Sequence, residues 1–280
     1  MKSSKLLMAV LVFLLFTSSL VYGCRNETWQ EHNDRAQQLL IAGKNEEAIS
    51  EFTKTIELKP DFFVAYANRG LAYQNIKEYQ KAIADYTMTL QLKPDYWPAY
   101  FNRGNAYGQI GQYDSSITDY SKAIELNSTD SMLYHNRGLS YANKNDYDKA
   151  IADFDTAIRL DPKNWQAYYN RAITYANKKD YEKALEDCTK ALEIEPNNID
   201  GLFFRANLYV DKKDYDKAIA DCSYVIGMKP NDASGYAARG AVYKLMGDKE
   251  LALADFSRCL ELSTDPQLNA KVKEALSELQ

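Results

Sequence analysis

The chain has 280 residues, a formal net charge of −5, and 46% apolar and 26% charged residues. These proportions are typical of a folded globular protein and argue against a disordered or fibrous one. The 34 basic and 39 acidic residues nearly balance, which argues against a nucleic-acid partner, because such proteins need a basic face. With two histidines and four cysteines, the chain has few residues for metal, redox or general-base chemistry. We therefore expect no enzyme and no bound metal or cofactor.

Residues 1–23 have the pattern of a secretory signal peptide. Lys2 and Lys5 precede an unbroken apolar run of 11 residues, Leu6–Phe16. A run of this length is typical of a signal peptide and too short to cross a hydrocarbon core of about 30 Å as a helix. We therefore expect the chain to be exported.

The residues that follow resemble a bacterial lipobox. The sequence Val21-Tyr22-Gly23-Cys24 has the small residue before the cysteine that such sites require, and in a lipobox the cysteine is lipidated and becomes the new N-terminus. We predict a lipid anchor on Cys24 and a short tether over residues 24–28. Ordinary cleavage near Gly23 and an uncleaved signal anchor are the alternatives.

From Trp29 the sequence repeats every 34 residues without insertion. The seven units cover residues 29–62, 63–96, 97–130, 131–164, 165–198, 199–232 and 233–266. The eighth position is small in every unit: Ala36, Gly70, Gly104, Gly138, Ala172, Ala206 and Gly240. The eleventh is leucine once and then tyrosine: Leu39, Tyr73, Tyr107, Tyr141, Tyr175, Tyr209 and Tyr243. Five units carry a proline near their end: Pro60, Pro94, Pro162, Pro196 and Pro230. The spacing predicts two closely packed antiparallel helices in each unit, with the proline ending the second.

This pattern of small residues, aromatic residues and proline resembles the tetratricopeptide repeat family. The resemblance implies an all-α fold, a right-handed α-solenoid of seven helix-turn-helix units over residues 29–266, whose first helices line a concave groove. A single hairpin cannot bury its apolar side alone, so neighbouring units must stack. Residues 267–280 carry one apolar stripe and predict a capping helix that covers the last unit.

Position seven is arginine and position twenty-three is acidic in every unit. The pairs are Arg35/Glu51, Arg69/Asp85, Arg103/Asp119, Arg137/Asp153, Arg171/Asp187, Arg205/Asp221 and Arg239/Asp255. The two positions lie on the two helices of one hairpin, so we predict repeated structural ion pairs. The alternative is an arginine ladder for anionic ligands. We expect the carboxylates of the chain to lie on solvated helix faces and not in a catalytic site.

Positions five, six and nine hold the candidate binding residues. Position six is asparagine in four consecutive units: Asn68, Asn102, Asn136 and Asn170. An asparagine both donates and accepts hydrogen bonds, and this row resembles the asparagine ladders with which some family members hold extended peptides. The residues that flank this row are Phe101, His135, Tyr169, Phe203, Asn105 and Asn207. We expect the four rings among them to be partly exposed. Two alternatives stay open: the asparagines reflect the family consensus, and the rings fold back into the hairpins.

The function that this resemblance implies is a non-catalytic scaffold that binds an extended segment or a helix of a partner protein, in envelope assembly. An adaptor that recruits an envelope hydrolase or protease, or a protein that touches glycan, is the alternative. Ala67, Phe101 and Tyr169 stand where chaperone-binding members carry a clamping lysine, so we expect no binding of Hsp70 or Hsp90 C-terminal tails. We expect a membrane-anchored lipoprotein, facing the periplasm from the outer membrane in a two-membraned cell, and otherwise a secreted or periplasmic protein.

The anchor is tested by the variant Cys24→Ala. Two or more acyl chains give stable membrane attachment, so this variant is expected to leave the membrane pellet and appear in the soluble fraction after cell fractionation. A variant that stays in the pellet with its N-terminus uncleaved would support the signal anchor instead.

Overall fold

The computed structural model describes residues 27–279, which form fifteen helices and no strand. Six hairpins pair α2 (Trp29–Ile41) with α3 (Asn45–Leu58), α4 (Phe63–Asn75) with α5 (Tyr79–Leu92), α8 (Ser131–Asn143) with α9 (Tyr147–Leu160), α10 (Trp165–Asn177) with α11 (Tyr181–Ile194), α12 (Ile199–Asp211) with α13 (Tyr215–Met228), and α14 (Ala233–Met246) with α15 (Lys249–Leu262). The helices α6 (Trp97–Gln109) and α7 (Tyr113–Leu126) follow one another in the chain between the second and third of these hairpins. A last helix, α16, spans Pro266–Ser277. The prediction of an all-α fold is confirmed. The predicted signal peptide and Cys24 lie outside the described residues.

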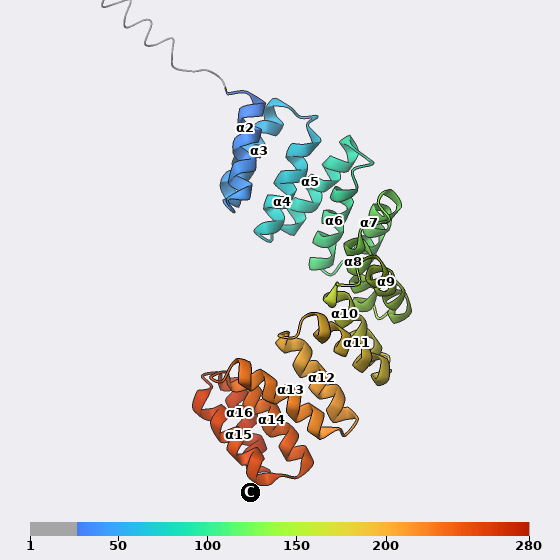
Figure 1. The fold of residues 1–280 in the computed structure, drawn as a ribbon. Helices are drawn as coiled ribbons and strands as arrows, with labels where there is room; N and C mark the ends of the chain where they lie inside the picture. The colour runs from blue at the N-terminus through green and yellow to red at the C-terminus, as the bar shows by residue number, and fades with distance from the viewer. Residues whose placement is uncertain (1–26, 280) are drawn as a thin grey trace, which may run out of the picture. The chain divides into compact units, whose positions relative to one another are not determined.

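The chain divides into two compact units after Gly111. In the first unit α3 packs on α4 and α5 on α6, and in the second each hairpin packs on the next through α9 and α10, α11 and α12, and α13 and α14. The first helices of neighbouring hairpins also touch, α2 with α4, α4 with α6, and α8 with α10. Within each unit the hairpins therefore stack in chain order (Figure 1), and we call the surface formed by their first helices the helix-A face.

The two helices of a hairpin approach most closely at position eight. A Cβ atom added to Gly70, Gly138 or Gly240 would lie 2.9 Å from the ring of Tyr86, Phe154 or Phe256 respectively, all at position twenty-four. In the fifth and sixth units the small residue is alanine, and the partner is cysteine: Ala172 with Cys188 and Ala206 with Cys222. In these two units a methyl group on the first helix thus stands opposite a small side chain on the second, whereas the first unit buries both a methyl group and a ring, Ala36 and Phe52.

Each turn between the helices of a hairpin depends on one residue in the left-handed region. Position fifteen has a φ between +59° and +88° in all seven units: Gly43, Lys77, Gly111, Asn145, Lys179, Lys213 and Gly247. Glycine and asparagine adopt this conformation readily, whereas lysine does so at a cost of about 1 kcal/mol. The turn geometry is therefore kept even where the residue does not favour it.

The C-terminal helix α16 packs on the last hairpin through its apolar stripe. Val272 is buried, and Leu268, Ala275, Leu276 and Leu279 surround it against Phe256 and Cys259 of α15. This contact covers the apolar side of the last unit, as the stripe predicts. Among residues 27–279, each helix is too short or too polar to cross a bilayer.

The close approach at position eight is tested by comparing two glycine-to-alanine variants. Both gain up to about 1 kcal/mol of helix propensity, so the difference between them reports packing. Gly227 lies in α13 with nothing within 4 Å of an added Cβ, whereas at Gly138 the Cβ would meet Phe154 and the Ala150 carbonyl oxygen. We expect Gly227→Ala to be neutral or stabilising and Gly138→Ala to lower the free energy of unfolding by about 1–2 kcal/mol, measured by urea denaturation. Equal stabilities would rule out the tight contact.

Candidate functional site

The predicted ion pairs form within the hairpins. In five units the arginine Nε and Nη2 both donate to the two oxygens of the position-twenty-three aspartate, at 2.6–2.9 Å: Arg69/Asp85, Arg137/Asp153, Arg171/Asp187, Arg205/Asp221 and Arg239/Asp255. The aspartates are buried, so each depends on this two-pronged contact for its charge to be compensated. Arg103 and Asp119 fall in different compact units.

The burial of these aspartates contradicts the expectation that the carboxylates lie on solvated helix faces. That expectation is wrong for Asp85, whose side chain is 7% exposed beside Arg69. It is equally wrong for Asp119, Asp153 and Asp187, which are also buried. The physical reason is clear at Asp85, because Arg69 Nε and Nη2 each donate to its carboxylate at 2.8 Å. These charge-assisted bonds replace the water that a solvated carboxylate would bind. Asp85 is therefore a buried structural group and not a surface charge.

The same arginines also bind the preceding hairpin. Arg69 Nη1 donates to Thr53 Oγ1 at 3.0 Å, and Arg137 Nη1 donates to Ser121 Oγ at 3.0 Å. Arg103 and Arg239 donate in the same way to Thr87 and Ser223, and Arg171 to Asp155. Most of the donors of these side chains are therefore committed to the fold, which argues against the arginine ladder for anionic ligands.

The arginines are held firmly in their charged form. The hydrogen bond that Arg137 donates to Asp153 raises the pKa of the guanidinium above its ordinary value, against the burial that lowers it. The Arg137 guanidinium also lies 5.8 Å from the centre of the Tyr134 ring, a cation–π contact. These arginines act as structural ties within and between hairpins.

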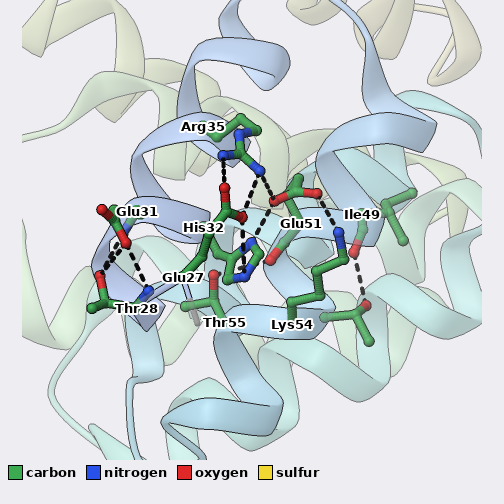
Figure 2. A network of polar contacts seen from close by, with 10 residues as sticks. Glu27, Thr28, Glu31, His32, Arg35, Ile49, Glu51, Lys54 and Thr55 are labelled. Carbon is green, nitrogen blue, oxygen red and sulfur yellow. Dashed lines mark hydrogen bonds and ion pairs between the residues drawn. The ribbon is translucent and has the colours of Figure 1, made fainter. Parts of the chain in front are cut away.

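The first hairpin carries a different polar cluster, shown in Figure 2. Its position-four residue is His32, where five of the other units have tyrosine, and its acid is Glu51 rather than aspartate. His32 Nδ1 lies 2.6 Å from Glu51 Oε2. Arg35 bridges the two acids: its Nη1 lies 3.2 Å from Glu51 Oε2, and its Nη2 lies 2.6 Å from Glu27 Oε1. Glu27 therefore occupies the place that a hydroxyl of the preceding hairpin takes in most later units, and its hydrogen bond from Arg35 lowers its pKa.

Among the described residues, Glu27, His32 and Glu51 bring ligand atoms within 4.8 Å of one another, as a metal site requires. Arg35 already binds both carboxylates, and Lys54 Nζ lies 2.7 Å from Glu51. These two cations balance the two carboxylate charges. The cluster is therefore a self-compensated ion network that fastens residue 27 to the first hairpin.

The buried cysteines are unsuited to nucleophilic chemistry. Cys188, Cys222 and Cys259 are free and buried. Burial raises the pKa of the Cys188 and Cys222 thiols to about 12, so these groups stay protonated at neutral pH. They fill space in the core.

The candidate asparagines lie on the helix-A face of both compact units. Asn68 and Asn102 belong to α4 and α6, Asn136 and Asn170 to α8 and α10, and all four side chains are half-buried. Asn170 Nδ2 lies 3.4 Å from His135 Nε2. No hydrogen bond is found from the Asn68, Asn102 or Asn136 side chain to any residue in the range 27–279. Three of the four amides are thus available to a ligand.

The residues at positions five and nine differ in exposure. Phe101, Tyr169, Phe203 and Asn105 are half-buried and Asn207 is exposed, whereas His135 is buried. The expectation of a partly exposed ring is therefore wrong for His135. Its ring packs edge-on against Phe154 at 5.8 Å, and burial lowers its pKa to about 4. Tyr169 packs edge-on against Phe204 of the next hairpin at 5.7 Å, so its ring contributes to stacking.

A recess of about 670 Å³ opens on the helix-A face at the C-terminal end of the second unit. Two predicted residues, Phe203 and Asn207 of α12, line it, together with Ala237, Ala238, Ala241 and Leu245 of α14 and Leu268 and Lys271 of α16. The α14 and α16 residues are not predicted from the sequence, because alanine and leucine carry neither an aromatic ring nor an amide. The sequence does show that these positions of α14 carry other residue types than in the preceding units, and this difference is the signal that could have pointed to the recess.

Family models for the tetratricopeptide repeat match residues 63–96, 97–130, 131–164, 165–198, 199–232 and 233–266. These ranges coincide with the second to seventh units of the period, and the first unit lies outside them. None of the curated proteins matches the chain.

Solved structures with a similar fold include three that cover most of the repeats. MamA of Desulfovibrio magneticus RS-1 is 22% identical over 62% of this chain and 99% of its own, with a TM-score of 0.59. A tetratricopeptide repeat protein of Parabacteroides merdae is 21% identical over 90% of this chain and 98% of its own, with a TM-score of 0.66. YrrB, a repeat protein with an unusual peptide-binding site, is 22% identical over 64% of this chain and 92% of its own, with a TM-score of 0.53. At these identities the likeness is one of fold.

The burial of His135 predicts a pH dependence of stability. Its pKa is about 4 in the folded chain against 6.5 ordinarily, so below pH 6.5 the unfolded chain takes up a proton that the folded chain does not. The free energy of unfolding is therefore unaffected by this group above pH 6.5. It falls as the pH drops toward 4, by up to about 3 kcal/mol.

The variant His135→Phe is the matched control, because it keeps a ring at the position and removes the titration. We expect wild type and variant to unfold in urea with similar free energies at pH 7 and to diverge between pH 6.5 and 4, the wild type losing more. Parallel losses in both proteins would show that His135 titrates normally.

Proposed function

The chain belongs to the tetratricopeptide repeat family, and we propose on this premise that it is a non-catalytic scaffold that binds a segment of a partner protein on the helix-A face of a compact unit. The observation that carries the proposal is the set of unpartnered amides among the described residues, those of Asn68 and Asn102 in the first unit and that of Asn136 in the second. An amide with free donor and acceptor groups can bind a peptide backbone whatever its side chains are.

The remaining chemistry of the hairpins supports a binding role. The arginines and aspartates are paired with one another, and the cysteines are buried, so the described hairpins offer amides and rings to a partner. YrrB is a solved relative in fold that has a peptide-binding site.

We place this scaffold at a membrane of the cell envelope, in envelope assembly, on the strength of the signal-like segment and Cys24. A lipid anchor holds a protein at the membrane surface, which brings the helix-A face close to other envelope proteins. A hydrolase or protease recovered as the bound partner would favour the adaptor role instead.

The proposal is tested by site-specific photocrosslinking in membrane-derived extracts of the source cells. A photoreactive residue at Asn136 is expected to capture a partner, whereas one at Ala152, exposed on the second helix of the same hairpin, is not. A synthetic peptide covering the crosslinked segment then gives a dissociation constant by fluorescence anisotropy. Capture at Ala152 alone would overturn the proposal.

The amide of Asn136 is tested with the same peptide and the variant Asn136→Ala. A lost amide bond costs about 0.5–1.5 kcal/mol, so we expect about two- to tenfold weaker binding. Asn143→Ala is the matched control, because this exposed asparagine ends the same helix. Equal affinities of the two variants would contradict backbone reading by the amide.

A further inference from the structure

The last hairpin departs from the three before it at every position that faces the recess. Position five is His135, Tyr169 and Phe203 in units four to six but Ala237 in unit seven, and position six is Asn136, Asn170 and Phe204 but Ala238. Position nine changes from Leu139, Ile173 and Asn207 to Ala241. Three large side chains are thus replaced by three methyl groups on one helix, and this loss of volume creates the recess.

A second recess of about 360 Å³ adjoins the first. The two share five lining residues: Ala237, Ala241, Leu245, Leu268 and Lys271. Leu245 is 58% exposed, at a position that is Asn143, Asn177 and Asp211 in the preceding units. An apolar residue has therefore replaced the polar residue of the three preceding units at the mouth of the recess, which extends its apolar lining toward solvent.

The charge of the lining has one sign. Lys271 lines both recesses and Lys244 lines the second, whereas no described acidic residue lines either. Lys244 is paired with Glu278, and Lys271 is exposed with no ion pair to any residue in the range 27–279. In a chain with 34 basic and 39 acidic residues, an apolar recess bordered only by lysine is complementary to a partner that is apolar and acidic.

The lining also distinguishes a helix from an extended segment. The larger recess offers hydrogen bonds from three side chains, Asn207, Ser234 and Lys271. An extended peptide lying on such a surface would leave most of its facing backbone groups unpaired, which is costly. A helix satisfies its backbone internally, and the three alanines of α14 let a second helix approach closely.

We propose that the paired recesses of α12, α14 and α16 bind an acidic amphipathic helix of a partner protein. Its apolar side chains at i, i+3 or i+4, and i+7 enter the recesses beside Ala241 and Leu245, and a carboxylate on its flank pairs with Lys271. This inference rests on the proposed scaffold function and adds a second site to the amide-lined part of the helix-A face.

The test selects peptides from a displayed library of helix-forming sequences about 18 residues long, a length at which isolated helices begin to be stable. The library is selected on the wild-type chain and counter-selected on Ala241→Trp, in which a ring fills the recess. Ala241 is exposed, so folding of this variant is expected to be unchanged and is checked by circular dichroism. We expect selected sequences to share apolar residues at helical spacing together with Asp or Glu.

The charge is tested separately on the selected peptides with Lys271→Glu, which leaves the recess open. We expect about fivefold weaker binding or more, against less than about twofold for Lys273→Glu, which is exposed on the same helix and outside the recess lining. Equal effects of the two reversals, or peptides without acidic residues, would overturn the proposal.

The outcomes separate this inference from the scaffold function. Peptides recovered without the counter-selection that bind Ala241→Trp as well as wild type but lose affinity for Asn136→Ala would leave the scaffold function standing and remove the recess as a site. A library that gives no binders would overturn this inference alone, because the scaffold function is decided by the photocrosslinking at Asn136.

Discussion

An arginine at position seven ties most hairpins together in two directions. In five units its Nε and Nη2 bind the buried aspartate of the same hairpin, as Arg69 binds Asp85, and in five its Nη1 reaches a side chain of the preceding hairpin. A buried aspartate without this partner would carry an uncompensated charge, at a cost of about 3–5 kcal/mol. The geometry of the hairpin and the spacing between neighbouring hairpins are therefore set by one side chain.

This constraint determines what the rest of the surface can do. Because the arginines and aspartates are consumed in pairs, the helix-A face presents amides, rings and small apolar residues. Specificity then depends on a few positions on the first helices, which can change without disturbing the ties between hairpins. Positions five, six and nine vary in this way along the chain, from Ala67 through His135 to Ala237 at position five.

The sequence predicts features that repeat and misses those that occur once. Both helices of every hairpin follow from the period, and the ion pairs follow because their partners stand at constant positions. The pairing of Asp85 is predictable in this way, whereas its burial is not, because burial depends on how the two helices pack. The burial of His135 depends on its contact with the Phe154 ring, which no periodic pattern contains.

The two ends of the repeat array are the hardest parts to predict for the same reason. The cluster around Arg35 needs Glu27, which lies outside the repeats. The recess arises because Ala237, Ala238 and Ala241 are too small to fill the space beside them. Small apolar side chains carry no functional group that would mark a binding site in the sequence.

Departures from the pattern at the two ends have different physical causes. In the first hairpin, Glu27 accepts from Arg35 Nη1, the donor that in most later units reaches the preceding hairpin, and also from Nη2, while His32 and Glu51 complete the cluster. In the last hairpin, α16 buries Val272 and already supplies that neighbour. Covering the end therefore does not require Ala237 and Ala241 to be small, or Leu245 to be apolar and exposed. Stability alone would favour larger side chains at the first two positions and a polar one at the third. The acidic partner helix that we propose would fill this space, and it accounts for the small residues there.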